Sequence, residues 1–314
     1  MTNNAENDGR TEGDTFSGVE HVPVLAETLT QQVAVPLDGT MVDVTIGQGG
    51  HSLLFGQTLS ESGIIIGLDV DDTALERSRN RLKPLACKVL LIRSNFSNLS
   101  ACLVQSGVDT VDFILADLGY SSDQLSDQAM GLSFQTDMPL DMRIDRSLNT
   151  TAADIVNTWD ETHLADTIYQ YGEDRASRRI ARFIVRHRQE EPIITTGQLA
   201  NIVCRALYRP GQKRRQRIHP ATRTFQALRI AVNHELDNLQ VLLNSAPALL
   251  KTGGRLAVIS FHSLEDRLVK VNFRENAKSG LYRVVTPKPI GAGEEEIEQN
   301  HRVRSAKLRI AEKL

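Results

Sequence analysis

Cysteine, tryptophan and long apolar runs are scarce in this chain of 314 residues, and each scarcity excludes a class of protein. The three cysteines, Cys87, Cys102 and Cys204, form no C-x-x-C pair, which argues against both a disulfide framework and a zinc site. No apolar run approaches the roughly 18 residues that span a bilayer, and the amino terminus lacks the apolar stretch of a signal peptide. We therefore expect a soluble, cytoplasmic protein without a membrane partner.

An excess of charge of one sign is also missing, because 36 basic and 39 acidic residues leave a formal net charge of −3. The net charge therefore does not indicate a nucleic-acid-binding protein, and only local patches of basic residues could indicate one. Hydrophobic residues make up 40% of the chain, which is enough for one large or two ordinary globular domains.

A glycine-rich turn between a predicted strand and a predicted helix is the most informative stretch of the chain. Residues 41–46 are apolar and β-branched, as in a strand that is buried on both faces of a parallel sheet. Gly47, Gly49 and Gly50 follow and allow a tight turn close to a ligand, and a helix is expected from Ser52. Together the three parts predict a nucleotide-binding corner.

A second apolar stretch supports this interpretation. Residues 64–68 form a predicted strand that ends at Asp69, 20 residues after Gly49. An acid at this distance can accept hydrogen bonds from ribose hydroxyls. The alternative is purely structural, with glycines that only make a turn and with Asp69 as the cap of the following helix.

Strands and helices then alternate, which predicts a doubly wound α/β sheet. The predicted elements are helices over 27–35, 72–81 and 99–105 and strands over 88–92 and 111–116. Asp72 is expected to cap the second helix. Because parallel strands present their carboxyl ends at one edge, Asp69, Phe96 and Asp117 are expected there together.

The alternation stops after residue 131. Helical patterns cover 152–159, 161–171, 176–187 and 196–207, and the sheet resumes at 255–261 after a long helix over 225–250 and a turn at 253–254. We predict a disordered tail over 1–18, a sheet domain formed by 19–131 and 218–314, and an inserted helical substrate-recognition subdomain over 132–217. An insertion at this point covers the ligand edge of the sheet.

The predicted insertion carries two basic patches. One helix repeats arginine at spacings of one, three and four residues, at Arg175, Arg178, Arg179, Arg182 and Arg186. The second patch is a loop rich in lysine and arginine at 209–217. A solvated helix face and a charged linker would show the same pattern. Two patches on one insertion favour phosphate contacts, so we expect salt-sensitive binding to RNA.

The carboxyl terminus distinguishes between two cofactor classes. Residues 282–286 and 305–311 can pair as strands, which gives a seven-stranded sheet ending in a hairpin-like pair. This arrangement is more typical of S-adenosylmethionine-dependent methyltransferases than of dehydrogenases. An NAD-linked oxidoreductase remains an alternative, although Ser52 stands where G-x-G-x-x-G requires its third glycine.

Several sequence blocks occur in order along the chain and resemble one known family. They are 43–52 (DVTIGQGGHS), 117–119 (DLG) with 121–122 (SS), 131–134 (GLSF), 139–143 (PLDMR), 171–173 (YGE), 219–229 (HPATRTFQALR) and 260–267 (SFHSLEDR). The chain is similar in these blocks to the RsmH (MraW) family, and only the amino-terminal tail is left uncovered. The resemblance implies a class I, Rossmann-like S-adenosylmethionine-dependent methyltransferase. It also implies methylation of the exocyclic N4 of the cytidine at position 1402, in the decoding centre of 16S ribosomal RNA.

The resemblance further implies the residues that bind S-adenosylmethionine. They are Gly49, Gly50, His51, Asp69, Phe96, Asp117 and Gln124. In physical terms, the loop backbone approaches the methionine and the sugar, Asp69 accepts from ribose hydroxyls, and Phe96 offers an aromatic wall to the adenine. We count His51 as a binding residue and not as a catalytic one.

Catalysis requires acceptors for the amine, because the lone pair of an exocyclic cytosine nitrogen is delocalised into the ring. The catalytic candidates are Asp117, as an acceptor from the amine, and Asp141, which together with Arg143 seats the base or a neighbouring phosphate. The segment after Asp117 lacks the two prolines that are common in amine methyltransferases. Tyr120 and Asp123 depart from the family pattern, and neither receives a role by analogy.

Further substrate contacts are expected from the blocks at 219–229 and 260–267. Arg223 and Arg229 are the candidates for RNA, while His262 and Ser263 are the candidates for shaping the base pocket. The lack of a G-x-S-x-G elbow argues against a Ser-His hydrolase. No group of histidines, cysteines and acids has metal-ligand spacing, so we expect no metal.

Three functions stay open from the residues alone: an RNA cytosine-N4 methyltransferase, an NAD-linked oxidoreductase and a non-catalytic RNA-binding ribosome-assembly factor. The partner of the first and third is 16S ribosomal RNA in the small ribosomal subunit. The sequence leaves open whether naked RNA, an assembly intermediate or the mature subunit is the substrate. A homodimer is one alternative for the oligomeric state, and the general base is not identified.

Overall fold

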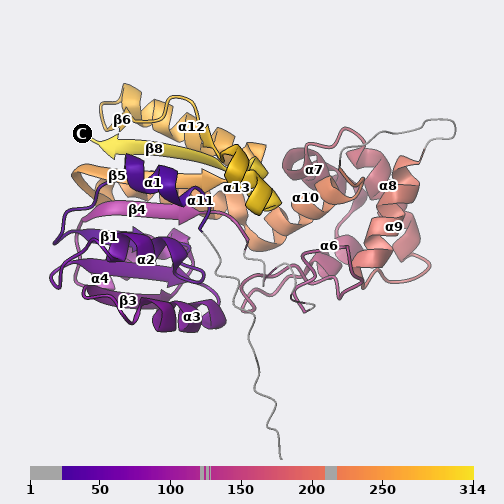
Figure 1. Ribbon diagram of the computed structural model, residues 1–314. Helices are drawn as coiled ribbons and strands as arrows, with labels where there is room; N and C mark the ends of the chain where they lie inside the picture. Colours follow the sequence, from indigo (N-terminus) through magenta and orange to yellow (C-terminus); the bar gives the residue numbers. More distant parts are fainter. Residues whose placement is uncertain (1–22, 121–123, 125–126, 128, 209–217) are drawn as a thin grey trace, which may run out of the picture.

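The computed structural model describes residues 23–120, 124, 127, 129–208 and 218–314. The predicted tail at 1–18, Asp123 and the basic loop at 209–217 lie outside these residues. Within the described ranges the chain forms a sheet body and a group of helices beside it (Figure 1).

The sheet has eight strands, in the order β3-β2-β1-β4-β5-β8-β6, with the short β7 paired to β8. The first five are parallel, while β8 runs antiparallel between β5 and β6. The bounds are β1 Thr40–Asp43, β2 Ile64–Asp69, β3 Lys88–Arg93, β4 Val111–Asp117, β5 Leu250–Ser260, β6 Tyr282–Val284, β7 Ile290–Gly291 and β8 Lys307–Lys313. The α/β fold with an antiparallel strand pair at its end is confirmed, and β7 adds one strand to the seven expected.

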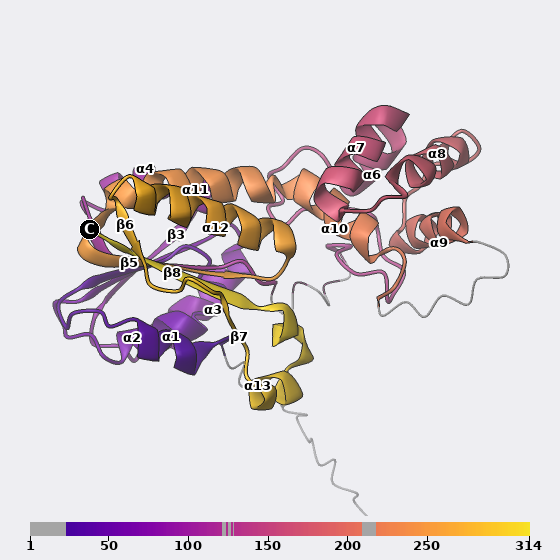
Figure 2. The same ribbon diagram turned by 90° about the horizontal axis from the view of Figure 1, so that it is seen from above.

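Helices cover both faces of the sheet, which explains why its central strands are apolar throughout. α1 (Ala26–Gln32), α2 (Gly50–Gly56) and α3 (Asp72–Leu82) lie on one side, and α4 (Leu99–Gln105), α11 (Glu235–Leu249) and α12 (Ser263–Lys278) lie on the other (Figure 2). The remaining short elements are η1 (Phe96–Asn98), α13 (Glu294–Gln299) and η2 (His301–Ser305). All four residues of β1 are buried between these layers.

The group of helices lies beyond the carboxyl ends of the parallel strands (Figures 1 and 2). It consists of α6 (Ala152–Thr158), α7 (Glu161–Gly172), α8 (Ser177–Arg188), α9 (Thr196–Leu207) and α10 (Thr222–Asn233). These helices share a core of their own, in which Ile155, Ile168, Ile184 and Val203 are fully buried. Within the described ranges, none of the helices combines the length and the apolarity that a bilayer crossing requires.

The predicted boundaries between the sheet domain and the helical subdomain stay a prediction. The packing of α10 concerns the boundary between residues 217 and 218. Phe225 and Leu228 of α10 belong to the core that α6 to α9 form. A boundary between residues 217 and 218 therefore separates α10 from the helices that it packs against. For this reason α10 counts as part of the helical group.

The predicted single helix over 225–250 is wrong. α10 and α11 meet at His234, whose φ of 51° is left-handed. The Oδ1 atom of Asn233 accepts a hydrogen bond from the Ile144 amide at 2.8 Å, which ties the end of α10 to a distant segment. The break places both Asn233 and Glu235 on the wall of a cavity.

Two local predictions also need correction. The cap of α3 is Asp71 rather than Asp72, since the Asp71 carboxylate accepts a hydrogen bond from the Thr73 amide at 2.9 Å. The turn expected at 253–254 lies inside β5, where the register against β4 shifts and Gly253 adopts a φ of 80°. Both differences shift an element boundary without changing the order of the elements.

Candidate active site

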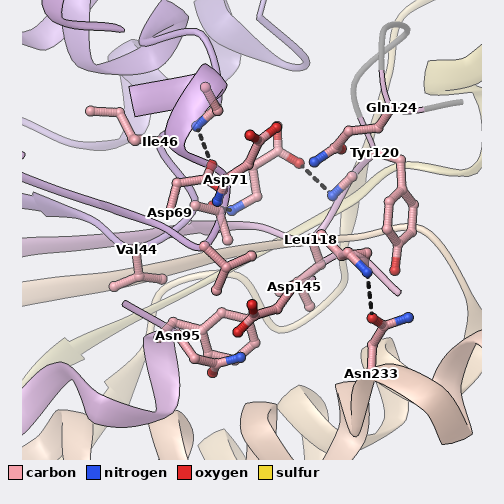
Figure 3. A pocket seen from close by; sticks show the side chains of 18 of the residues that line it. Val44, Ile46, Asp69, Asp71, Asn95, Leu118, Tyr120, Gln124, Asp145 and Asn233 are labelled. Carbon is pink, nitrogen blue, oxygen red and sulfur yellow. Dashed lines mark hydrogen bonds between the residues drawn. The ribbon is translucent and has the colours of Figure 1, made fainter. Parts of the chain in front are cut away.

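A cavity of about 930 Å³ opens at the carboxyl edge of the parallel strands. Its walls come from the segments that follow β1, β2, β3, β4 and β5 and from the junction of α10 and α11. In the close view, Val44, Ile46 and Asn95 lie on one side and Tyr120 and Asn233 lie opposite (Figure 3). A ligand in this cavity therefore meets both the strand ends and the break between two helices.

Most of the residues that the resemblance assigns to the cofactor lie on this wall. They are Gly50, His51, Asp69, Phe96, Asp117 and Gln124. Gly49 is different, because it faces away from the cavity toward α3. A Cβ atom at Gly49 would lie 3.3 Å from the Leu82 side chain and from Ser78 Oγ, and its φ is 74°. Glycine is therefore required at this position by the turn and by helix packing.

Asp69 fixes the glycine-rich turn at the end of β2. Its Oδ2 accepts a hydrogen bond from the Gly47 amide at 3.0 Å, and its Oδ1 accepts one from the Asp71 amide at 3.0 Å. Burial raises the pKa of Asp69, and the two amide bonds oppose that shift. Each oxygen keeps lone-pair capacity for a further donor, because a carboxylate can accept about four hydrogen bonds.

Asp117 ends β4 and lies beside a buried histidine. Its amide donates to Thr45 Oγ1 at 2.7 Å, and its Oδ1 accepts from the Gly119 amide at 3.1 Å. Its Oδ2 lies 3.5 Å from Nε2 of His51. A third group, Asp43, is only 2% exposed, and burial raises its pKa to about 6. Sequence reasoning missed Asp43, because the predicted strand over 41–46 placed this acid in its interior, whereas β1 ends at Asp43.

Sequence reasoning also missed that Arg229 pairs with Glu235, a residue of the cavity wall. Arg229 donates from Nε and Nη2 to the two carboxylate oxygens of Glu235, at 2.8 and 3.0 Å. The guanidinium carbon lies 4.2 Å from the centre of the Tyr120 ring, and burial raises the pKa of the Tyr120 phenol. Arg229 was predicted to contact RNA, but its side chain is only 19% exposed and already paired. Spacing could not reveal this pair, since it crosses the break between two helices.

Asp141 and Arg143 do not line the cavity. Arg143 donates from Nε to Oδ1 of Asp141 at 2.8 Å and from Nη2 to Oδ2 at 2.9 Å. Although partial burial disfavours the charged carboxylate, these bonds hold the pKa of Asp141 below its ordinary value. The pair supports residues 144–148, of which Asp145 and Leu148 are part of the wall. The structure thus assigns the two residues a supporting position behind the wall.

Arg223 and Ser263 meet at a bridge between the helical group and the sheet body, outside the cavity wall. Ser263 Oγ and Arg267 Nη2 donate to the Glu173 carboxylate at 2.6 and 2.8 Å. Arg223 donates to the Glu173 main-chain carbonyl at 3.1 Å. The bonds from Ser263 and Arg267 hold the pKa of Glu173 below its ordinary value. Residues 171–173, at the end of α7, are thereby tied to the start of α12.

His262 lies at the start of α12 and belongs to a group that sequence spacing did not predict. Potential metal-ligand atoms of Glu235, His262 and Glu265 lie within 4.8 Å of one another. Protein donors already engage the carboxylates, however: Arg229 bonds both oxygens of Glu235, and the Phe261 amide donates to Oε2 of Glu265 at 2.9 Å. The Glu265 amide in turn donates to His262 Nδ1 at 3.4 Å, which completes a cap on α12. Nε2 of His262 lies 3.1 Å from Oε1 of Glu265 and 4.0 Å from Oε2 of Glu235.

The fold and the site together define a class of protein. Five parallel strands, an antiparallel strand next to the edge and a ligand cavity behind a glycine-rich turn form a class I methyltransferase of the Rossmann-like α/β type. More particularly, the chain belongs to the MraW methylase family, whose profile matches residues 18–314.

Two relatives of this chain are both named "Ribosomal RNA small subunit methyltransferase H". The protein from Acidobacterium capsulatum is 49% identical over 300 residues, which cover 93% of this chain and 98% of that protein. The protein from Cyanothece sp. is 49% identical over 294 residues, which cover 94% of this chain and 95% of that protein. The similarity therefore extends over nearly the full length of both chains in each comparison.

Proposed function

We propose that this protein transfers a methyl group from S-adenosylmethionine to the exocyclic N4 of the cytidine at position 1402 in 16S ribosomal RNA. The observation that carries the proposal is the 49% identity, over nearly full length, to relatives named as methyltransferases of ribosomal RNA from the small subunit. Membership of a methylase family favours methyl transfer over hydride transfer and over RNA binding without chemistry. The choice of atom and nucleotide depends on the sequence blocks that resemble the RsmH family.

The polar groups of the cavity fit S-adenosylmethionine. Asp69 presents two carboxylate oxygens, each oriented by one backbone amide, which suits the two adjacent hydroxyls of a ribose. Phe96 offers the wall for the adenine ring, and Gly50 leaves the turn without a side chain at the cavity. When bound, the cofactor supplies an electrophilic methyl group on a positively charged sulfur.

Asp117 is the residue best placed to receive the amine. It lines the cavity at the end of β4, and its side chain is 20% exposed. A carboxylate that accepts a hydrogen bond from the amine increases the electron density on nitrogen, and it is fixed in place before the reaction begins. The Gly119 amide holds Oδ1, which leaves Oδ2 for the substrate. Asp141, which is engaged with Arg143, contributes by supporting the wall.

Methyl transfer in vitro tests the proposal. The protein is incubated with isotopically labelled S-adenosylmethionine and small ribosomal subunits that lack the methyl group, and the digested nucleosides are identified by mass spectrometry. We expect label in N4-methylcytidine, and a loss of about 100-fold in kcat for Asp117→Asn. Asp109→Asn, an exposed acid before the amino end of the same strand, is the matched control. Label in a different nucleoside would contradict the proposal.

A further inference from the structure

A buried histidine on the cavity wall lacks hydrogen bonds, and a role in packing or binding alone does not explain this. His51 is 6% exposed, and within the described part of the chain neither Nδ1 nor Nε2 has a hydrogen-bond partner. Buried polar groups in folded proteins are nearly always hydrogen-bonded, since an unbonded one destabilises the folded state. An imidazole retained in this state beside a ligand cavity therefore points to a function.

Two carboxylate groups, those of Asp117 and Asp43, interact with this imidazole. Nε2 lies 3.5 Å from Oδ2 of Asp117, which itself lines the cavity. The buried Asp43 interacts electrostatically with both His51 and Asp117, and it accepts from Ser52 Oγ at 2.8 Å and from the Thr45 amide. The sheet fixes this group, because Asp43 ends β1 and Asp117 ends the adjacent β4. Asp117 and His51 both line the cavity, whereas Asp43 is buried and is not part of the wall.

We propose that Asp117, His51 and Asp43 form a proton relay that removes the proton released when the amine is methylated. This inference depends on the proposed function, because only an amine acceptor carries a proton that must leave. Asp117 touches the substrate and is catalytic, whereas His51 and Asp43 act through it and are positioning residues.

The relay accounts for every atom and electron of the reaction. The nitrogen lone pair forms the new N–C bond, and the electron pair of the C–S bond goes to sulfur, which becomes a neutral thioether. The nitrogen then has a positive charge and one proton in excess. This proton passes to Oδ2 of Asp117 and then to Nε2 of His51, and the Asp43 carboxylate stabilises the resulting imidazolium. The methylated amine leaves neutral, and Asp117 returns to its ionised form.

Asp43 suits the last position of the relay. Burial raises its pKa to about 6, while the electrostatic attraction of His51 and the hydrogen bond from Ser52 oppose that shift. Asp43 is therefore mostly ionised at neutral pH and becomes protonated in mild acid. A relay that needs the ionised form loses activity as the pH falls through about 6.

The experiment compares wild type, His51→Gln and Asp43→Asn with small ribosomal subunits as substrate. Each variant is measured for kcat at saturating donor and RNA from pH 5 to pH 9, for the solvent deuterium isotope effect on kcat, and for the Kd of S-adenosylhomocysteine by calorimetry. His163→Gln is the matched control, since His163 is exposed on α7 and stacks on Trp159 away from the cavity wall. Circular dichroism confirms that each variant is folded.

We expect His51→Gln to lower kcat by at least about 10-fold while the Kd changes by less than about 3-fold. Asp43→Asn, which is nearly isosteric, is expected to lose the decrease in kcat below about pH 6. The relay is overturned if both variants keep the wild-type kcat and pH profile, or if the loss in His51→Gln is matched by a loss of S-adenosylhomocysteine binding. A wild-type protein that methylates no cytidine would instead overturn the proposed function, and the relay with it.

Discussion

At the scale of single residues, burial and pairing determine the pKa of each aspartate near the cavity. Asp43 is fully buried and Asp69 is partly buried, and burial raises the pKa of both, while Asp141 is paired with Arg143 and has a lowered pKa. The sequence identifies Asp69 because it follows a strand, but it cannot separate Asp141 from the site. The partner that holds Asp141 outside the wall is only two residues away, and the same motif would fit a substrate contact equally well.

Asp43→Asn should stabilise the protein at alkaline pH although it lowers activity. The folded-state pKa of about 6 lies above the ordinary value of 3.8, so the burial of Asp43 destabilises the folded state increasingly from about pH 4 to pH 6 and fully above pH 6. The difference of about two pH units corresponds to roughly 3 kcal/mol at most. The measurement is the free energy of unfolding from urea titrations. The gain should be full at pH 8, fall to about half at pH 5 and vanish below about pH 4, and a variant less stable than wild type at pH 8 would contradict this assignment.

Glu235→Gln should destabilise the protein, because it leaves the Arg229 guanidinium buried without its carboxylate. Removing one partner of a buried ion pair costs about 3–5 kcal/mol. The double variant Arg229→Met with Glu235→Gln should recover much of this loss, and Glu190→Gln, an exposed acid at the end of α8, is the control. Unfolding free energies that are additive across the double-mutant cycle would show that the pair is not coupled.

At the scale of elements, predictions succeed where the signal is local. The bounds of α4 and α9 agree with the predicted ranges, and α9 begins with a capping box between Thr195 and Gln198 that can be recognised from the sequence. The break at His234 was missed because Asn233 is held by Ile144, 89 residues away. A hydrogen bond between such distant residues produces no periodic pattern in the sequence of either segment.

The arginine face of α8 should contribute to RNA binding through phosphate contacts. Arg178, Arg182 and Arg186 are exposed, while Ile180 and Ile184 on the same helix are buried. Replacing the three arginines by alanine should reduce the slope of log K against log salt by about two to three, since each phosphate contact contributes about 0.7–0.9. Filter binding from 50 to 300 mM salt measures the slope. Arg274→Ala on α12 is the control, and an unchanged slope in the triple variant would exclude this face.

At the scale of the whole molecule, the helical group and the sheet body are joined at the edge of the site. Glu173 receives bonds from Ser263 and Arg267 of the sheet body and from Arg223 of α10. The alternation of strands and helices and the edge at which the cavity opens could be predicted, because alternating patterns and strand ends are local. This bridge could not, since it joins three segments that are far apart in the sequence.

Glu173→Ala should loosen the bridge without affecting cofactor binding. The Glu173 side chain is 40% exposed, so the loss of stability should be small, at about 1 kcal/mol or less. We expect KM for the RNA substrate to rise about 3- to 10-fold, because the helical group is less well positioned over the cavity. The Kd of S-adenosylhomocysteine should stay within about 2-fold. A rise in that Kd with an unchanged KM for RNA would contradict the positioning role.

The proposed methyl transfer is tested in cells by nucleoside mass spectrometry of 16S ribosomal RNA from strains with and without this gene. We expect one methyl group, on N4 of the cytidine at position 1402, to be missing in the deletion strain, to return with the wild-type gene and not to return with Asp117→Asn. An unchanged cytidine at that position, or a methyl group lost from a different base, would contradict it.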